Sequence, residues 1–264
     1  MARDDLQPEP RRIQPESHKT PATSVQRDNP LPVQGVDQFI GAAFTTGTSY
    51  YYVLDLLRIE QPIQLSQSVQ DILGLDPAGA TIQCITDRIH PDDLAFVARA
   101  EKMAMTILDR DIGMDQASNY KISYCARLKI RDNSYRLFNQ QVLILDADQT
   151  QGVTRSLRIH TDISHLIDKN NYKLSLLNIL GGESLLNIDV LKKDAKPQAT
   201  PSPFTRREVE VLRLLAEGRT SIYIASALEI SANTVKNHRK NMLRKAECRT
   251  TGQLISKCVS EGLI

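Results

Sequence analysis

Residues 231–245 read SANTVKNHRKNMLRK, and this stretch decides the fold of the C-terminal part of the chain. It holds five Lys and Arg residues and no Asp or Glu. Ser231 is a preferred N-cap residue, because its hydroxyl oxygen accepts a hydrogen bond from a free N–H group of the first turn. At about 100° per residue, Val235, Met242 and Ala246 share one side of a helix, and the basic and amide side chains share the other. The stretch predicts a helix with one packing face and one basic face.

Helix signals surround this stretch. TRRE is a capping box, in which Thr205 accepts from the N–H of Glu208 and the Glu208 side chain reaches back to the cap. A second helix takes SIYIASAL, and EIS makes the turn into the basic helix. Thr250 and Gln253 repeat the box at the start of a fourth helix. We therefore predict four short helices over residues 204–264.

The basic face has the chemistry of DNA recognition. An α-helix with its side chains is about 10 to 12 Å in diameter and fits the major groove of DNA. There, Lys and Arg donate to guanine and Asn pairs with adenine, while cationic side chains displace the counterions of the phosphates. The side chains predicted to read bases are Lys236, Asn237, Lys240 and Asn241. Those predicted to hold phosphates are Thr220, Ser221, His238, Arg244 and Lys245. Simple capping stays open for Thr220 and Ser221, and packing or capping stays open for His238.

Positive charge is concentrated in the same part of the chain. The 264 residues have a formal net charge of +2, yet from residue 203 onward 11 Lys and Arg face 6 Asp and Glu. The preceding residues hold 22 Lys and Arg against 25 Asp and Glu. A run of like charge is usually a solvated helix face, but a local basic excess within this helix pattern favours nucleic-acid binding.

The C-terminal unit resembles the LuxR/FixJ-type helix-turn-helix over about residues 203–264. The matching positions are Thr205, Glu208, Leu212, Gly218, Ile224, Ala225, Ser231, Thr234, Val235, Lys236, His238 and Lys245. The resemblance implies a DNA-binding domain whose third helix enters the major groove and whose fourth usually serves dimerisation. It adds Thr234 to the expected DNA-binding residues. The implied partners are double-stranded DNA and a second copy of the chain, with RNA polymerase as a further candidate.

The N-terminal part shows strand signals. Residues 120–131, 134–148 and 153–164 carry β-branched, aromatic and alternating apolar residues separated by turns, and 50–57 and 62–66 look like two shorter strands. With the helices between them, they predict an α+β domain with a five-stranded antiparallel sheet. The predicted fold class is therefore this α+β domain followed by an all-α domain of four helices.

The element order, with IHPDD and DIS, resembles the PAS sensor fold over about residues 40–166. Pro91 starts a helix over about 92–108, and His90 is interpreted as its entry residue, since no second metal or haem ligand stands at useful spacing. Cys84 and Cys125 lack the Asn-Cys-Arg-Phe pattern of flavin-adduct PAS domains. We predict no flavin, no other cofactor and no metal.

Composition divides the chain into five segments. Six of the 12 prolines lie in the first segment, Gly181-Gly182 signals a tight hairpin turn, and KKDAKPQATPSP reads as a linker. The predicted segments are a disordered tail 1–36, a PAS-like sensor domain 37–166, a β-hairpin extension 167–191, a linker 192–203 and the helix-turn-helix domain 204–264.

Function follows from these predictions. We expect a transcription regulator whose PAS-like domain senses a ligand, with binding of a partner protein by that domain as the alternative. An enzyme is disfavoured, because no paired nucleophile motif, GxSxG or phosphate-cradling Gly loop occurs. The four cysteines form no CxxC, and no stretch approaches the roughly 18 apolar residues of a membrane span. We therefore expect a reduced, cytoplasmic protein without membrane contact.

Overall fold

The structure is a computed structural model that describes residues 47–61, 63–180, 182–192, 199–200 and 202–264. All of these residues lie in one compact unit, Pro32–Ile264. The predicted tail 1–36 and most of the predicted linker lie outside the described residues.

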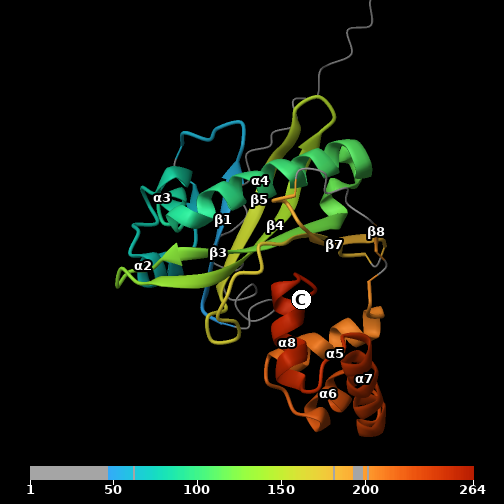
Figure 1. Cartoon of the computed structure of the whole chain (residues 1–264). Coiled ribbons are helices and arrows are strands. Elements are labelled where there is room, and N and C mark those ends of the chain that lie inside the picture. The colour runs from blue at the N-terminus through green and yellow to red at the C-terminus, as the bar shows by residue number, and fades with distance from the viewer. Residues whose placement is uncertain (1–46, 62, 181, 193–198, 201) are drawn as a thin grey trace, which may run out of the picture. The chain divides into compact units, whose positions relative to one another are not determined.

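An antiparallel sheet occupies the N-terminal part of the described chain (Figure 1). Its strands are β1 (Ser49–Asp55), β2 (Gln64–Leu65), β3 (Tyr120–Lys129), β4 (Tyr135–Asp148), β5 (Gly152–Asp162), β6 (Leu174–Asn178), β7 (Ser184–Ile188) and β8 (Ala199–Thr200). They lie in the order β2-β1-β5-β4-β3-β6-β7-β8. We call the described residues 47–200 the sheet domain.

The prediction of a five-stranded sheet is wrong, since the described residues form eight strands in one sheet. The three additional strands continue the sheet from β3. Tyr120 to Tyr124 pair with Leu174 to Asn178, so the predicted hairpin joins the sheet through its first strand. Hairpin turns have local signals, whereas the choice of a neighbouring edge depends on contacts that are distant in sequence.

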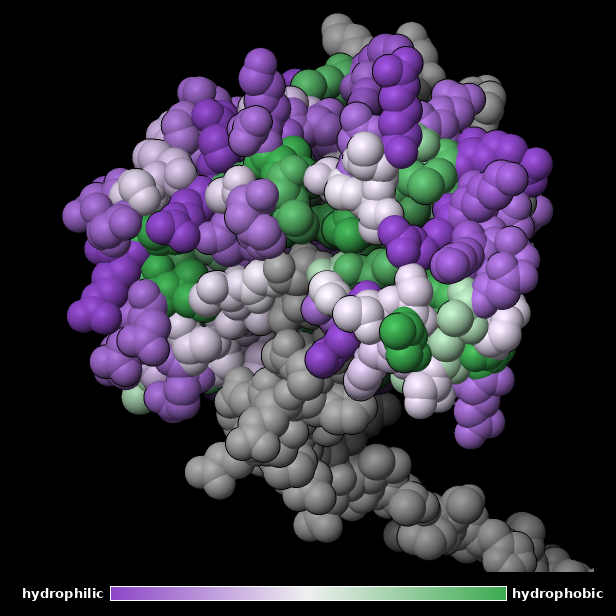
Figure 2. Space-filling view, turned by 90° about the horizontal axis from the view of Figure 1, so that it is seen from below, coloured by the Kyte–Doolittle hydropathy of each residue, from purple (hydrophilic) through white to green (hydrophobic). Residues whose placement is uncertain are grey.

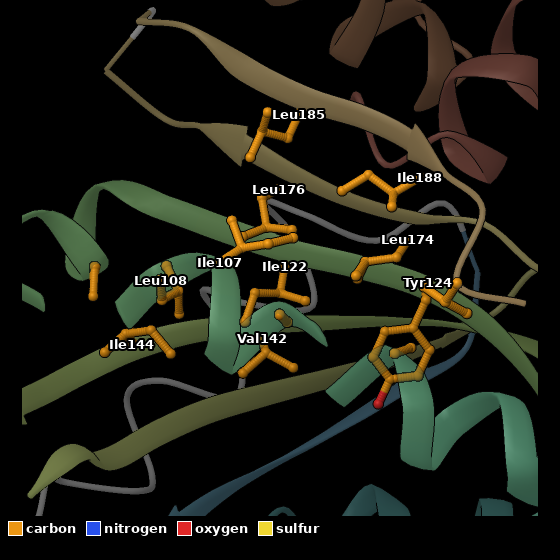
Figure 3. Close-up of a cluster of buried hydrophobic side chains, with 14 of the residues drawn as sticks. Ile107, Leu108, Ile122, Tyr124, Val142, Ile144, Leu174, Leu176, Leu185 and Ile188 are labelled. Atoms are coloured by element: carbon orange, nitrogen blue, oxygen red, sulfur yellow. The ribbon is translucent and has the colours of Figure 1, made fainter. Parts of the chain in front are cut away.

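Helices cover one face of the sheet, which we call the inner face. They are α2 (Ser68–Leu73), α3 (Ile82–Thr86) and α4 (Pro91–Ile107), followed by a π-helical turn, Leu108–Ile112, and a 3₁₀ helix, Met114–Asn119. Figure 3 shows Ile107 and Leu108 close to Ile122 of β3 and Val142 of β4, within the cluster that holds this layer together. Burial of such side chains supplies most of the stability of the layer.

The start of α4 depends on two acceptors. His90 is its N-cap, and its Nδ1 accepts from the N–H of Asp92 at 3.2 Å, as a helix-entry residue should. The carboxylate of Asp93 is fully buried and accepts from Arg127 of β3 at 2.6 Å. Because a buried carboxylate needs such partners, this contact fixes the helix against the sheet.

Four helices form the C-terminal part, which we call the helical domain. They are α5 (Arg206–Ala216), α6 (Ser221–Ala227), α7 (Ala232–Lys245) and α8 (Thr251–Ser260). Both predicted capping boxes are present, at Thr205 with Glu208 and at Thr250 with Gln253. The side chains buried between the helices include Leu212, Ile224, Val235, Met242 and Leu254. The predicted class, an antiparallel sheet with helices followed by an all-α domain of four helices, is confirmed.

Candidate nucleic-acid interface

The helix α7 has the two faces that its sequence predicts. Val235 and Met242 are fully buried against the other helices. The exposed side chains on the remaining surface include five that we call the basic face, namely Lys236, Asn237, Lys240, Asn241 and Arg244. No acidic residue occurs between Ala232 and Lys245, so nothing on the helix itself neutralises this positive face. Figure 2 shows mostly hydrophilic side chains on the visible face of the molecule, with hydrophobic ones gathered in smaller areas.

A tight turn sets the angle between α6 and α7. The N–H of Ile230 donates to the carbonyl of Ala225 at 2.9 Å, and Glu229 adopts a positive φ of 53°. Ser231 then caps α7, with its hydroxyl accepting from the N–H of Thr234 at 3.0 Å. The turn thus satisfies a carbonyl at the end of α6, and Ser231 caps the N-terminus of α7. Because both helix ends have partners, the two short helices can pack at a fixed angle.

Arg239 ties three helices together. Its guanidinium donates to the hydroxyl of Ser221 on α6 at 2.9 Å and to the hydroxyl of Thr251 on α8 at 3.0 Å. Arg239 belongs to the basic run 231–245, where it has no local signal for a role of its own. These two bonds identify it as a positioning residue, because they fix α7 relative to its neighbours and direct the guanidinium inward.

Lys245 also has a structural partner. Its Nζ lies 2.6 Å from Oε2 of Glu208, the residue that completes the capping box of α5. Burial opposes ionisation of Glu208, but the hydrogen bond from Lys245 and the capping bonds hold the pKa of Glu208 below its ordinary value. Lys245 therefore contributes to the core of the domain as well as to the charge beside its basic face.

The other predicted DNA-binding residues lie at the ends and margins of this face. Thr220 caps α6 and accepts from the N–H of Tyr223 at 3.3 Å, while Ser221 accepts from Arg239. The hydroxyl of Thr234 lies 2.8 Å from that of Ser231. His238 is half-buried on α7. Thr220, Ser221 and Thr234 thus take part in caps or inter-helix bonds at the edge of the face formed by the five exposed side chains.

A second concentration of polar groups lies inside the sheet domain. On the inner face, the carboxylate of Glu101 accepts from Arg158 at 2.6 and 2.9 Å and from the hydroxyl of Tyr124. Burial opposes ionisation of Glu101, yet the charge and hydrogen bonds of Arg158 hold its pKa below the ordinary value. This ion pair was not predictable from local sequence signals, because its partners lie 57 residues apart.

His160 lies beside this ion pair. Its Nδ1 is 2.7 Å from the hydroxyl of Tyr50, and burial, reinforced by the charge of Arg158, lowers the pKa of His160 to about 3. The imidazole is therefore neutral near pH 7. Within the described part of the chain, its Nε2 and the Nε2 of the neighbouring Gln140 are buried without a hydrogen-bond partner. Buried polar atoms of this kind are uncommon in folded proteins.

In the residues that the structure describes, no cluster of three or more His, Cys, Asp or Glu side chains is arranged to hold a metal ion. None of the described helices combines the length and apolar character needed to cross a membrane.

A capped helix, a tight turn and a second helix with an exposed basic face define a helix-turn-helix unit. Residues 202–258 match the family described as bacterial regulatory proteins, luxR family. The C-terminal part of the chain is therefore a helix-turn-helix domain of the luxR family. The matched family consists of regulatory proteins, which is the class that the sequence predicted in place of an enzyme.

Three known proteins are similar to this chain over different shares of its length. The regulatory protein SdiA of Escherichia coli is 46% identical over 61 residues, which are 23% of this chain and 25% of SdiA. The chain thus spans a quarter of the length of this relative. Among solved structures, the alignment with the VqmA dimer of Vibrio cholerae covers 88% of this chain and 89% of the VqmA chain, with 15% sequence identity and a TM-score of 0.30. A PAS-B domain of Drosophila melanogaster Cycle with bound glycerol covers 43% of this chain and 98% of its own, with 15% identity and a TM-score of 0.31.

Proposed function

We propose that the chain is a sequence-specific DNA-binding transcription regulator in which α7 lies in the major groove. One observation carries the proposal: α7 exposes Lys236, Asn237, Lys240, Asn241 and Arg244 on one side and buries Val235 and Met242 on the other. Lysine and asparagine side chains on one helix face supply donors and acceptors for base edges, and the cations attract phosphates. The luxR-family match over the same residues supports this assignment.

The roles of the individual side chains follow from their position on the basic face and from the partners they already have. Lys236, Asn237, Lys240 and Asn241 read bases. Arg244 holds a phosphate, and Thr220, Ser221, Thr234, His238 and Lys245 contribute to backbone contact from the margins. Ser221 and Lys245 do so while engaged with Arg239 and Glu208, so they serve more to place the helix than to add charge.

The regulator acts as a homodimer and recognises an inverted repeat, with half-sites about one helical turn apart or at a similar fixed spacing. Selection of bound duplexes from a random library, followed by footprinting, tests this. Enrichment of an inverted repeat is the expected result. Enrichment of a single asymmetric site bound by one copy contradicts the dimer, and failure to enrich any sequence contradicts specific recognition. RNA polymerase is a further candidate partner at a promoter.

The sheet domain provides the input to this regulator by binding a small molecule with hydrogen-bonding groups. The support is the buried polar set around His160, Gln140 and the Glu101–Arg158 pair, where two polar atoms lack partners within the described residues. A ligand that accepts from Gln140 and bonds with the imidazole of His160 would satisfy both. Native mass spectrometry of the purified protein tests this. A retained small molecule is expected, whereas an empty domain that captures a partner protein in pull-downs supports the alternative of control by association.

A further inference from the structure

The exposed surface of α7 is ordered in two rows. Three exposed asparagines are spaced four residues apart, and three exposed cations beside them have the same spacing. The asparagines are Asn233, Asn237 and Asn241, and the cations are Lys236, Lys240 and Arg244. Residues four apart lie on the same side of a helix, so each set forms a row along α7. We call them the asparagine row and the cation row.

The asparagine row has the dimensions of a short stretch of DNA. A step of four residues rises about 6 Å along a helix and turns about 40° around it, so the row spans about 12 Å within a sector of about 80°. Stacked base pairs are about 3.4 Å apart. One asparagine of the row therefore meets about every second base pair, and the whole row covers about four to five pairs.

The fold leaves the asparagine row facing outward and without bonds. Val235 and Met242 are fully buried on the opposite side of α7 and fix which side of the helix faces out. The helix start does not use the Asn233 side chain, because the hydroxyl of Ser231 accepts from the N–H of Thr234. Among the residues that the structure describes, no group forms a hydrogen bond with the three amides. The row therefore contributes nothing to the packing or capping of the helical domain.

Three asparagines on one side of a helix need a reason outside the helix. Asparagine is a poor helix former, since its amide competes with the backbone for hydrogen bonds. Alanine at the same positions would give a more stable helix. The asparagine row thus weakens α7 without a compensating contact among the described residues, and a local conflict of this kind is typical of side chains that serve binding.

The amide group is suited to one base in particular. In the major groove, an asparagine can accept from the N6 amino group of adenine and donate to its N7, and no other base presents this pair of groups. Lysine and arginine only donate, so they are suited to guanine and to phosphates. The asparagine row contains no carboxylate and no cation, which favours adenine over cytosine and guanine.

We propose that the asparagine row reads adenines, and that Asn233 is a specificity-determining residue beside Asn237 and Asn241. Each half-site of the target then carries adenines, on either strand, at about every second position over about four to five base pairs. The cation row lies beside these adenines and contacts guanine and phosphates. The inference rests on the proposed function, since it names the bases that the same helix recognises.

The experiment removes one acceptor from one adenine at a time. The duplex that the full-length wild type selects is prepared with 7-deazaadenine at single positions, which replaces N7 by a C–H group and leaves base pairing and the minor groove unchanged. Titration with the wild type should show binding at least about fivefold weaker at the adenines that the row reads. In each half-site these adenines should lie about two base pairs apart.

Single variants then assign each adenine to one side chain. Asn233→Ala, Asn237→Ala and Asn241→Ala should each become insensitive to 7-deazaadenine at one position and stay sensitive at the others, because the lost bond is shared by the amide and that base. Lys240→Ala is the matched control, since Lys240 lies between two of the asparagines but belongs to the cation row. It should weaken binding to the normal and the substituted duplexes equally and keep the wild-type ratio between them.

Thermal unfolding separates base reading from folding. None of the three alanine variants should unfold at a lower temperature than the wild type, because alanine is the better helix former and the amides have no partner among the described residues. A lower unfolding temperature for Asn233→Ala would make this residue structural and would overturn its assignment.

The remaining outcomes distinguish this inference from the proposed function. A selected duplex whose affinity is independent of every adenine N7 overturns reading by the asparagine row, although the chain still recognises a sequence. Sensitivity that the three alanine variants leave unchanged overturns it as well. If only Asn233→Ala keeps the full wild-type sensitivity, Asn233 is not a reader. Failure to select any duplex contradicts the proposed function itself.

Discussion

Nζ of Lys245 at the end of α7 lies 2.6 Å from Oε2 of Glu208 in the first turn of α5. Glu208 is buried, and its carboxylate also accepts from the N–H of Thr205 at 2.8 Å. Removal of the lysine leaves a buried carboxylate without its cation, so Lys245→Ala should lower the free energy of unfolding of the helical domain by about 1 to 3 kcal/mol. Thermal unfolding followed by circular dichroism measures this.

Arg244→Ala is the matched control for that experiment, because Arg244 is the exposed neighbour of Lys245 on the same helix turn. Its unfolding curve should coincide with that of the wild type. Equal unfolding of Lys245→Ala and the wild type would show that the pair contributes no net stability.

Arg244 has a different predicted role on DNA. If Arg244 contacts a phosphate, Arg244→Ala should weaken binding to every duplex to a similar extent. The slope of log K against log salt should fall in magnitude by about 1, because one fewer counterion is released. Titrations at several salt concentrations measure this, and an unchanged slope would place Arg244 away from the phosphates.

His160 makes the stability of the sheet domain depend on pH. Burial first, and then the charge of Arg158, lowers its pKa in the folded chain to about 3 from the ordinary 6.5. Between these values the unfolded chain binds one more proton, so stability falls as the pH falls through this window. Relative to the His160→Gln variant, the free energy of unfolding of the wild type should fall by about 1.4 kcal/mol for each pH unit below 6.5. Urea unfolding from pH 7 to pH 4.5 tests this, and parallel profiles of the two proteins would contradict a buried neutral imidazole.

Lys121 also makes the stability of the protein depend on pH. It lies on the face of β3 opposite to Ile122 and Tyr124, and burial, followed by the charge of Arg213 on α5, lowers its pKa to about 7. Between about pH 7 and 10.5 the unfolded chain binds more protons, so stability rises with pH across this window. Lys121→Met should therefore raise the free energy of unfolding at pH 7. The difference in this free energy between variant and wild type should shrink as the pH rises. Urea unfolding at pH 7, 8 and 9 measures it, with Lys129→Met on the same strand as control. A difference that is constant in pH would contradict the assignment.

Local chemistry in the sequence predicted the helical domain well. The cap of Thr205 with Glu208, the cap of Ser231 and the buried positions Val235 and Met242 depend on residues within one or two helical turns of each other. Such signals are readable in a single sequence, because helix caps and helix faces have fixed spacings.

Contacts between distant segments were not predictable in the same way. Asn139 and Val259 are 120 positions apart, and neither carries a local signal for docking α8 on the sheet. The bonds from Arg239 to Ser221 and Thr251 likewise link three helices through one side chain that resembles any other cation of the basic run. Strand order beyond β3 was missed for the same reason, since edge pairing is decided by packing across the whole fold.

The central claim is that α7 reads bases, and Asn237→Ala tests it most directly. Asn237 is exposed on the basic face and can pair bidentately with adenine. Binding is titrated on the selected duplex and on a scrambled duplex of the same length and salt concentration. The account predicts a loss of about 1 to 3 kcal/mol on the selected duplex and little change on the scrambled one. An equal loss on both duplexes, or no loss on either, would contradict base reading by this helix.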